Sequence, residues 1–331
     1  MSQQVTLNET HRIMTICNAC RYCEGFCAVW PAMELHRGFK DSDLKYLANL
    51  CHNCRGCYYA CQYAPPHEFN LNAPQTLAKL RKETYEEFAW PRPLAKLFTN
   101  NGLHVFWISL LSIIVFMCGS MAAYGVQNFF SAHVGAESFY KIVPYWLMLV
   151  LFTLIMLFSI FTFVHSVRAM WKITESDKVS YGICDYIQAV KDAATLRYLD
   201  GGGDGCNYPD HKFCFSRKQF HHLTFYGFLL CLLSTSIAFI YDHGMGWPAP
   251  YSFFSLPVIL GTIGGIGLCA GTGGLVWLKC VMDRRPHDES STGMDVSFTV
   301  LLFLISLSGL LLLMLRSTSL MGLMLCVHIG L

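Results

Sequence analysis

Charged side chains are scarce in this chain. Only 14% of the 331 residues are Asp, Glu, Lys or Arg, and 53% are hydrophobic, whereas about a quarter of a soluble globular domain is charged. The formal net charge is +2, and no basic stripe outweighs the acids, which argues against nucleic acid as a partner. The shortage lies mostly beyond residue 100. We therefore expect a water-soluble head followed by a largely lipid-embedded remainder.

A secretory signal is also missing, because the opening residues MSQQVTLNETHR are polar. Cysteine, by contrast, is abundant: the chain has 16, and eight of them fall within residues 17–61. Without a secretory signal, a cysteine-rich head is expected in a reducing compartment, where disulfides are rare. The eight cysteines are therefore better metal ligands than disulfide partners.

Their spacing indicates iron–sulfur clusters. The first quartet is Cys17-x2-Cys20-x2-Cys23-x3-Cys27, and the second is Cys51-x2-Cys54-x2-Cys57-x3-Cys61. Both match the bacterial ferredoxin run, in which the fourth cysteine binds the other cluster of a two-cluster protein. We therefore predict two [4Fe–4S] clusters with crossed ligation. One is assigned to Cys17, Cys20, Cys23 and Cys61, and the other to Cys51, Cys54, Cys57 and Cys27.

Two other interpretations of the quartets are weaker. Zinc sites usually have cysteine pairs separated by longer loops, and a disulfide framework needs an oxidising compartment. Between the quartets, Asp41-Ser42-Asp43-Leu44 followed by KYLANL predicts a helix N-cap and a short helix. No alternating strand pattern flanks either quartet. We therefore expect an all-helical ferredoxin-like head over residues 1–98.

Residues 99–331 are expected to form a transmembrane helix bundle. Five apolar runs reach the roughly 20 residues that cross a bilayer, and a sixth, of about 13 residues, does not. The predicted fold class is therefore all-α: a helical two-[4Fe–4S] ferredoxin-like head with a polytopic bundle of five full spans and a truncated sixth. The five predicted spans are 103–126, 143–166, 222–241, 253–278 and 294–315.

Lys and Arg fix the expected orientation. They cluster before the first span, between the second and third, and between the fourth and fifth. The connection after the first span holds only Lys141, the one after the third holds none, and the one after the fifth holds only Arg316. By the positive-inside rule, the head and the long loop 167–220 are cytoplasmic. This loop contains an amphipathic helical pattern starting near Ile183, and its role is either a plain connector or a docking element for the head or a partner.

Two weaker motifs were also considered. Cys206, His211 and Cys214 could bind a metal, although loop cysteines more often do not. The fourth span contains Gly265-x-Gly267-x-x-Ala270, which formally matches a dinucleotide fingerprint. It lies inside an apolar helix with no preceding strand, so we attribute it to close helix or ring packing instead.

Histidines near the spans are candidate haem ligands, because intramembrane ionisable residues are usually functional. His104, His165, His221 and His222 lie near the expected cytoplasmic boundary, and His328 lies nearer the midplane. His222 continues onto the apolar face of Phe225, Leu229 and Leu233, so it is the first expected ligand, with His165 or His104 opposite. The alternative for each is an interfacial histidine that bonds only to lipid head groups.

A family resemblance covers nearly the whole chain. It is carried by CNACRYCEGFCAVWPAME, LCHNCRGCYYACQYAPPHEFNLNAP, FHHLTFYGFLLC, LPVILGTIGGIGLCAGTGGLVWLK and SLSGLLLLMLR, which resemble the tricarballylate utilisation protein B (citrate utilisation protein B) family. The resemblance implies a membrane protein with two [4Fe–4S] clusters and a haem. It implies reoxidation of the reduced flavin of a partner dehydrogenase that converts tricarballylate to cis-aconitate, with electrons passed to quinone. The family continues through a full last helix, whereas this chain ends at His328-Ile-Gly-Leu.

The expected function is therefore an electron relay without a catalytic residue of its own. An FAD-dependent, tricarballylate dehydrogenase-like partner supplies electrons to the clusters, a haem b is an optional carrier, and quinone is the acceptor. We expect a multi-pass protein of the bacterial inner membrane. The alternative is a heterodisulfide- or fumarate-reductase-like iron–sulfur membrane subunit, whose clusters serve a catalytic site on another chain.

Overall fold

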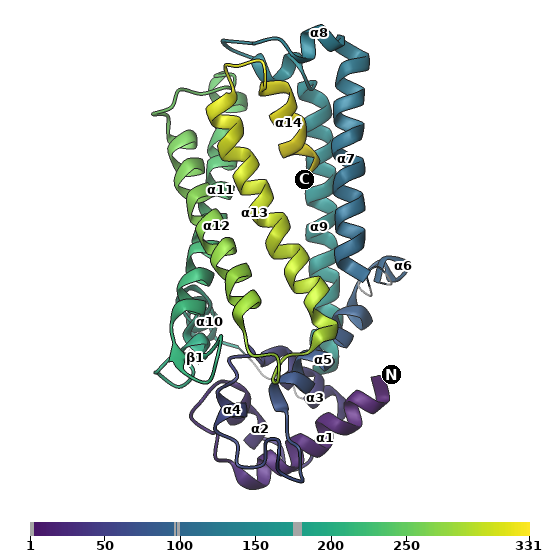
Figure 1. Ribbon diagram of the computed structural model, residues 1–331, viewed down its shortest axis with the longest axis vertical. Helices are drawn as coiled ribbons and strands as arrows, with labels where there is room; N and C mark the ends of the chain where they lie inside the picture. The colour runs from purple at the N-terminus through teal and green to yellow at the C-terminus, as the bar shows by residue number, and fades with distance from the viewer. Residues whose placement is uncertain (1–2, 96, 98–99, 175–180) are drawn as a thin grey trace. The chain divides into compact units, whose positions relative to one another are not determined.

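A computed structural model of the protein describes residues 3–95, 97, 100–174 and 181–331 (Figure 1). The predicted domain boundary at residues 98 and 99 and residues 175–180 of the long loop lie outside the described residues. The chain divides into two compact units. The head unit comprises Met1–Thr99, Ile160–Gln219 and Trp277–Gly293. The span unit comprises Asn100–Ser159, Phe220–Val276 and Met294–Leu331.

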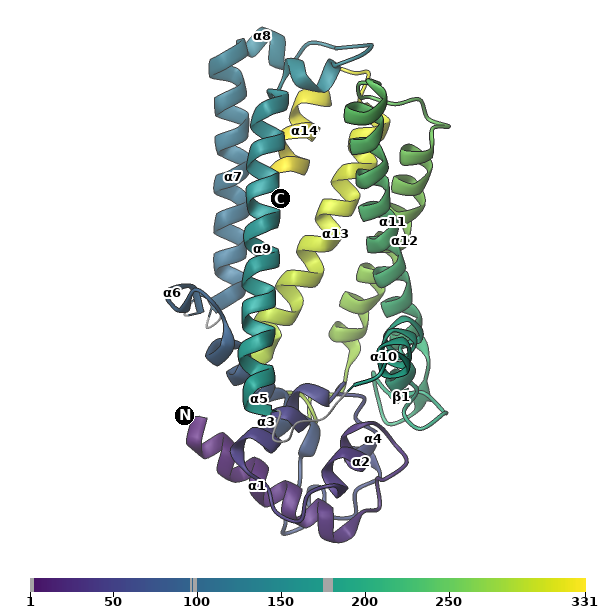
Figure 2. The ribbon, with the colours of Figure 1, turned by 180° about the vertical axis from the view of Figure 1, so that it is seen from behind.

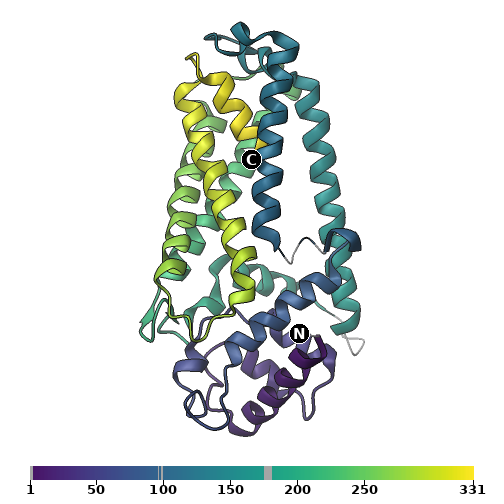
Figure 3. The same ribbon diagram turned by 45° about the vertical axis from the view of Figure 1, so that its right-hand side comes forward.

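The cysteine-rich part of the head unit is helical, as predicted. Its helices are α1 (Gln3–Cys20), α2 (Val29–Glu34), α3 (Asp41–Leu50), α4 (Gly56–Tyr59), α5 (Ala73–Phe88) and α6 (Arg92–Ala95). Helices α1 and α5 lie side by side, as the purple and blue segments of Figure 3 show. Thr6 donates a hydrogen bond to Glu83 at 2.7 Å across this pair.

An apolar core holds these helices together. Its most buried members, at 0–1% exposure, are Ile13, Met14, Val29, Met33, Leu44, Leu47, Ala48, Leu77 and Leu80. Cys51 belongs to the same core at 8% exposure. The second quartet is therefore anchored directly to the packed interior.

The helix predicted between the quartets is confirmed as α3, with one difference at its start. Its N-cap is Lys40 rather than Asp41 or Ser42. The Asp43 carboxylate accepts the backbone N–H of Lys40 at 2.9 Å, which satisfies a donor that the helix itself leaves open. The short acidic run therefore caps the helix from inside its first turn.

The long loop contributes further structure to the head unit. It contains α10 (Ile183–Thr195), η3 (Arg197–Asp200) and a two-stranded antiparallel sheet of β1 (Cys206–Asn207) and β2 (Phe213–Cys214). The predicted amphipathic helix is confirmed by α10. Residues 197–217 pack on the second quartet: the backbone N–H of Asn207 donates to the Cys54 carbonyl oxygen at 3.0 Å. The structure thus favours a docking role for this loop.

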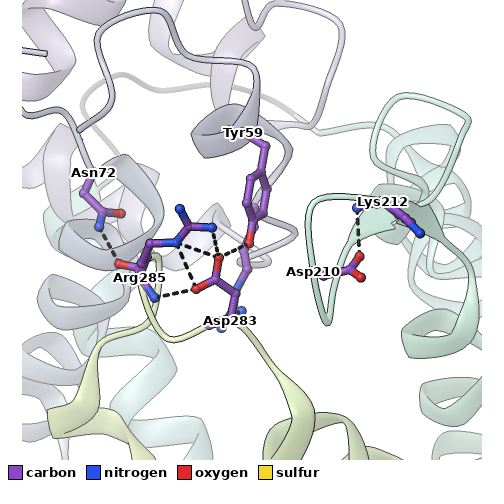
Figure 4. A network of polar contacts seen from close by, with 7 residues as sticks. Tyr59, Asn72, Asp210, Lys212, Asp283 and Arg285 are labelled. Carbon is purple, nitrogen blue, oxygen red and sulfur yellow. Dashed lines mark hydrogen bonds and ion pairs between the residues drawn. The ribbon is translucent and has the colours of Figure 1, made fainter. Parts of the chain in front are cut away.

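A second segment, after the fourth span, also packs on the cysteine-rich helices. The Asp283 carboxylate accepts hydrogen bonds from the Tyr59 hydroxyl at 2.8 Å and from the Arg285 guanidinium at 2.7 Å (Figure 4). The Asn72 amide donates to the Arg285 carbonyl oxygen at 2.9 Å. Tyr59 lies between two cysteines of the second quartet, so this polar network holds α4 in place. The short helix η4 (Glu289–Ser291) follows.

Five helices are long and apolar enough to cross a membrane, which confirms the predicted class of a membrane protein. They are α7 (Asn101–Tyr124), α9 (Tyr145–Thr174), α11 (Ser216–Met245), α12 (Leu256–Val281) and α13 (Thr292–Leu315). The connections add α8 (Val126–Phe129) and η2 (Ser138–Lys141). The last helix, α14 (Met321–Gly330), has ten residues and packs against α7 (Figures 1 and 2).

Small residues let α11 and α12 approach closely in the span unit. A Cβ added to Gly264 would lie 2.8 Å from the Gly227 carbonyl oxygen and 2.9 Å from Cys231 Sγ. At Gly271 the nearest atom would be Thr224 Oγ1 at 2.5 Å. The glycines of the fourth span therefore serve helix packing, as we expected when rejecting the dinucleotide fingerprint.

Candidate functional site

The first candidate site is a cavity at the end of α1. Cys17, Cys20, Cys23 and Cys61 all line it, and we call these four the first set. The cavity contains about 410 Å³ of space not filled by atoms. Three of the four come from the first quartet and one from the second. The structure therefore gathers the four thiols that the crossed assignment places on one cluster.

Local backbone conformation brings these thiols together. Helix α1 ends at Cys20, and Arg21 adopts a left-handed conformation with φ of 54°. The backbone N–H of Arg21 still bonds to the Cys17 carbonyl oxygen at 2.8 Å. The chain therefore turns immediately after the helix, and this turn places Cys23 at the cavity beside the two helical cysteines.

The electrostatics of the first set agree with this grouping. Burial, followed by repulsion from Cys23, Cys61 and Cys20, raises the pKa of Cys17 to about 12. Burial and the neighbouring thiols likewise raise the pKa of Cys23 to about 12. Thiols with raised pKa values need a nearby positive charge to become thiolates, and a bound metal supplies such a charge.

The remaining four cysteines form the second set: Cys27, Cys51, Cys54 and Cys57. A hydrogen bond with Cys54, followed by burial, raises the pKa of Cys27 above its ordinary value, and Cys51 and Cys57 repel its thiolate as well. Cys57 also interacts with Cys17 and Cys23. The two sets are therefore neighbours, close enough to influence each other electrostatically.

The four thiols of the first set line a shared space. Among the described residues, no group of three His, Cys, Asp or Glu side chains is placed to hold a single metal ion. In a [4Fe–4S] cube each cysteine binds a different iron atom, so the four sulfurs surround a volume rather than meet at a point. The thiol donors and the cavity of the first set fit that requirement.

A buried donor at the same cavity supports this fit. Trp30 lines the cavity and is 3% exposed. Its Nε1 is buried and has no hydrogen-bond partner among the residues that the structure describes, and leaving such a donor unsatisfied destabilises the fold. Because hydrogen bonds to cluster sulfurs are common, a sulfide in the cavity would give this indole N–H an acceptor.

Sequence reasoning missed the groups that surround the second set. Arg81 donates a hydrogen bond to the Cys51 carbonyl oxygen, and Arg217 donates one to the Asn53 carbonyl oxygen at 2.8 Å. Arg55 is 1% exposed and stacks its guanidinium over the Tyr208 ring at 4.3 Å. Arg217 and Tyr208 lie about 150 residues from the quartet in sequence, so no local pattern could have revealed them.

Cys206 also adjoins the second set. It is 1% exposed, and its thiol donates to the Leu199 carbonyl oxygen at 3.2 Å. Its interaction with Cys54 is the main cause that lowers the pKa of Cys54. Its predicted partners for a separate metal site do not join it, because Cys214 Sγ donates to the Tyr208 carbonyl oxygen at 2.8 Å and His211 packs on the Tyr59 ring. The structure offers no support for metal binding by Cys206, His211 and Cys214.

The predicted haem histidines occupy dissimilar surroundings. In the head unit, His165 is exposed on α9 and packs near the rings of Trp90 and Phe161. In the span unit, Nδ1 of His104 bonds to the Asn100 carbonyl oxygen at 2.9 Å, and the His222 ring lies 5.8 Å from that of Tyr226.

His328 is the histidine that lines a large cavity. The cavity lies within the span unit, holds about 1270 Å³ of space including its open side, and is lined by Gly261, Gly265, Ser306, Gly309 and other residues of α11, α12 and α13. His328 Nδ1 is 3.1 Å from the Ile305 carbonyl oxygen, which can only accept a hydrogen bond. Ser308 Oγ is also 3.1 Å from Nδ1. The tautomer with its proton on Nδ1 would donate to the carbonyl and leave Nε2 with a free lone pair.

His328 lines this cavity and His222 does not. Phe228, six residues beyond His222, is the residue of α11 nearest to His222 that lines it, and six helical residues rise about 9 Å. The cavity therefore begins beyond the level of His222 on this helix.

Comparison with known proteins accords with both units. A model of the citrate utilization protein B Fer4-like domain matches residues 10–87, and a model of citrate utilization protein B matches residues 101–331. Citrate utilization protein B of Escherichia coli is 44% identical over 323 residues, covering 97% of this chain and 84% of that protein. No solved structure matches the chain.

Proposed function

The chain belongs to the citrate utilization protein B family, and from this we propose that it relays electrons from the reduced flavin of a partner dehydrogenase to membrane quinone. The Fer4-like domain and five apolar helices give it the character of an iron–sulfur electron-transfer protein of the membrane. The proposal adds two [4Fe–4S] clusters, a haem b and a specific donor and acceptor. The donor is an FAD-dependent dehydrogenase of the tricarballylate or citrate type.

The single observation that carries this proposal is the cavity of the first set. Four thiols from two separate quartets line one space of suitable size, and the other four thiols interact beside it. Two adjacent clusters would supply successive one-electron carriers. The residues of this chain hold them, separate them from bulk water and set their charge environment.

The electron count is balanced by two external reactants. A reduced flavin gives up two electrons and two protons and becomes oxidised flavin. A quinone takes up two electrons and two protons and becomes quinol. The protein passes the electrons singly and neither makes nor breaks a bond in the organic acid.

The cavity around His328 supports the haem part of the proposal. A histidine that ligates a metal usually donates its other ring N–H to a backbone carbonyl or carboxylate, and His328 is placed to do so toward Ile305. Gly309 makes room for the imidazole itself, because a Cβ there would lie 2.9 Å from His328 Cε1. We therefore favour His328 over His222 as the haem ligand, with the cavity as the binding space.

The orientation is likewise part of the proposal. The basic residues in alternate connections support a cytoplasmic head and a bacterial inner-membrane location. Reporter fusions at residues 130 and 247 should read as external, and fusions at 200 and 287 as internal. The reverse pattern would contradict the topology.

The relay is tested by flavin reoxidation. The purified protein in lipid discs should accelerate reoxidation of the reduced partner dehydrogenase only when quinone is present. Cys17→Ser should abolish this acceleration. Cys184→Ser removes an exposed cysteine of α10 and should leave it intact. Reoxidation that proceeds equally well with the Cys17→Ser protein would refute the proposal.

The haem assignment has a separate spectroscopic test. The visible spectrum of purified protein should show a b-type haem, which should be lost in His328→Ala and retained in His222→Ala. Cluster signals should persist in both variants. Retention in His328→Ala together with loss in His222→Ala would return the assignment to the third span, and absence of haem in the unaltered protein would remove haem from the proposal.

A further inference from the structure

The surroundings of the two cysteine sets differ in charge. Two guanidinium groups adjoin the second set: Arg81 donates to the Cys51 carbonyl oxygen and Arg217 to the Asn53 carbonyl oxygen. Neither forms an ion pair with a carboxylate among the described residues, so no bonded carboxylate offsets their charge. The Arg55 guanidinium is directed elsewhere, to the Asp283 carbonyl oxygen at 2.9 Å.

The first set has no comparable concentration of charge. Arg21 and Glu24 are the charged residues that line its cavity, and they have opposite signs. Both are exposed, so water and salt screen their fields. The Arg21 guanidinium also bonds to the Asn18 carbonyl oxygen at 3.0 Å. The net field of this shell is close to neutral.

Hydrogen bonds to sulfur differ less between the sets. The backbone N–H of Asn53 donates to Cys51 Sγ at 3.4 Å, and that of Tyr63 donates to Cys61 Sγ at 3.3 Å. The Trp30 indole adds a neutral donor at the first set, and the backbone N–H of Gly56 adds one at Cys54 of the second set. These neutral contributions are similar, so charge remains the main difference.

Reduction adds one negative charge to a cluster, and its potential depends on net charge, hydrogen bonds to sulfur and solvent exposure. Burial alone would disfavour the added charge at the second set. Uncancelled cations favour it, and they act most strongly where water is excluded. The two guanidinium groups of Arg81 and Arg217 beside one added electron decide the sign.

We propose that the cluster on the second set has the higher reduction potential, that Arg81 and Arg217 raise it, and that electrons therefore enter at the first set and leave from the second. This inference rests on the proposed function, since it requires two clusters. It ranks the two clusters by reduction potential. The two quartets have identical spacing, so the sequence motif alone does not rank them. Arg81 and Arg217 act through their positive charge on the cluster and do not contact the electron donor.

An EPR redox titration of the full-length protein tests the order directly. Cys17→Ser and Cys51→Ser identify which signal belongs to which set. The second-set cluster should titrate at the higher potential, with at least a tenfold preference for the electron, which is about 59 mV for a one-electron couple. Equal potentials or the reverse order would overturn the inference. Fewer than two [4Fe–4S] signals in the unaltered protein would instead contradict the proposed function.

Arginine variants test the cause. Arg217→Gln should lower the potential of the second-set cluster and leave the other unchanged, whereas Arg217→Lys keeps the charge and should retain most of the potential. Arg12→Gln alters an exposed arginine that pairs with Glu9 and should shift neither cluster. If Arg217→Gln fails to assemble the second cluster, Arg81→Gln provides the same comparison. An unshifted potential in an iron-replete glutamine variant would overturn the role of charge.

Discussion

The two compact units are packed in different ways. The head unit combines an apolar core of fully buried leucines and methionines with polar links between distant segments, such as Tyr59 to Asp283. The span unit brings α11 and α12 together through glycine, with backbone of one helix against backbone of the other at Gly227 and Gly264. Large side chains therefore fill the interior of the head unit. In the span unit, glycines, which have no side chain, let two helices pack closely.

This difference follows from the two solvents. In water the head gains free energy by burying apolar surface, whereas lipid provides no such drive between helices, and close van der Waals contact takes its place. The same reasoning predicts that each unit responds to its own kind of substitution. Perturbations that affect both units equally would contradict the comparison.

Loss of a crossed ligand should produce the largest effect. Cys61→Ser should remove the cluster of the first set, and Cys27→Ser that of the second, because each residue lies with the three cysteines of the other quartet. Iron analysis should fall from about eight to about four atoms per chain. EPR of each variant should show which signal is lost, while any haem spectrum of the span unit persists. Loss of the signal from the variant's own quartet would refute the crossing.

A cavity in the head core should have the next largest effect. Leu44 is fully buried, and Leu44→Ala should destabilise the head by about 2–5 kcal/mol. Hydrogen exchange of the full-length protein should show faster opening of α1, α3 and α5. Leu35→Ala removes a leucine that is 83% exposed and serves as the control. Equal loss of protection in α12 would mean that the two units do not unfold independently.

Filling a glycine contact tests the span unit in the opposite direction. Gly264→Leu places a side chain where a Cβ already meets the Gly227 carbonyl oxygen at 2.8 Å, and such overpacking costs about 1–3 kcal/mol. The thermal midpoint in detergent should fall while the cluster EPR signals are retained. Gly119→Leu is the matched control, because a Cβ at Gly119 meets nothing within 4 Å. A similar midpoint for both variants would contradict glycine-mediated packing.

Acid should affect the head through the Asp283 network. Hydrogen bonds from Arg285, followed by those from Tyr59, hold the pKa of Asp283 below its usual range. A carboxylate with a lowered pKa in the folded state stabilises above its unfolded pKa of about 3.9, and this contribution is lost as pH falls through the folded value. The unaltered head should therefore lose stability below about pH 4. Asp283→Asn should show a weaker acid dependence by circular dichroism; an unchanged dependence would exclude this carboxylate.

Sequence patterns predicted those helices that are determined by residues close together in the sequence. Apolar runs gave the five spans, and the acidic run gave α3, although its cap is Lys40. The cysteine spacing marked the two quartets because each spans only a few residues, whereas the crossing between them came from the ferredoxin pattern. The ligand assignment itself stays a prediction, since only the positions of the thiols are described.

Contacts between distant segments were not predictable in this way. Arg217 bonds to the loop of the second quartet across 164 residues, and nothing in either segment specifies the other. The haem histidines illustrate the same limit: periodicity favoured His222, whereas the cavity is lined by His328. The direction of a face can be read from sequence, but whether that face meets a cavity depends on tertiary packing.

The distance in sequence between the second quartet and residues 197–217 also has a consequence for synthesis. Translation proceeds at about 5–20 residues per second, so the roughly 160 residues between Cys54 and Arg217 take about 8–30 seconds to make. During that interval the nascent head lacks the segment that later packs on this quartet. A scaffold that delivers iron and sulfide would meet an open second site co-translationally, and arrival of Asn207 at Cys54 would then close the site behind the delivered cluster.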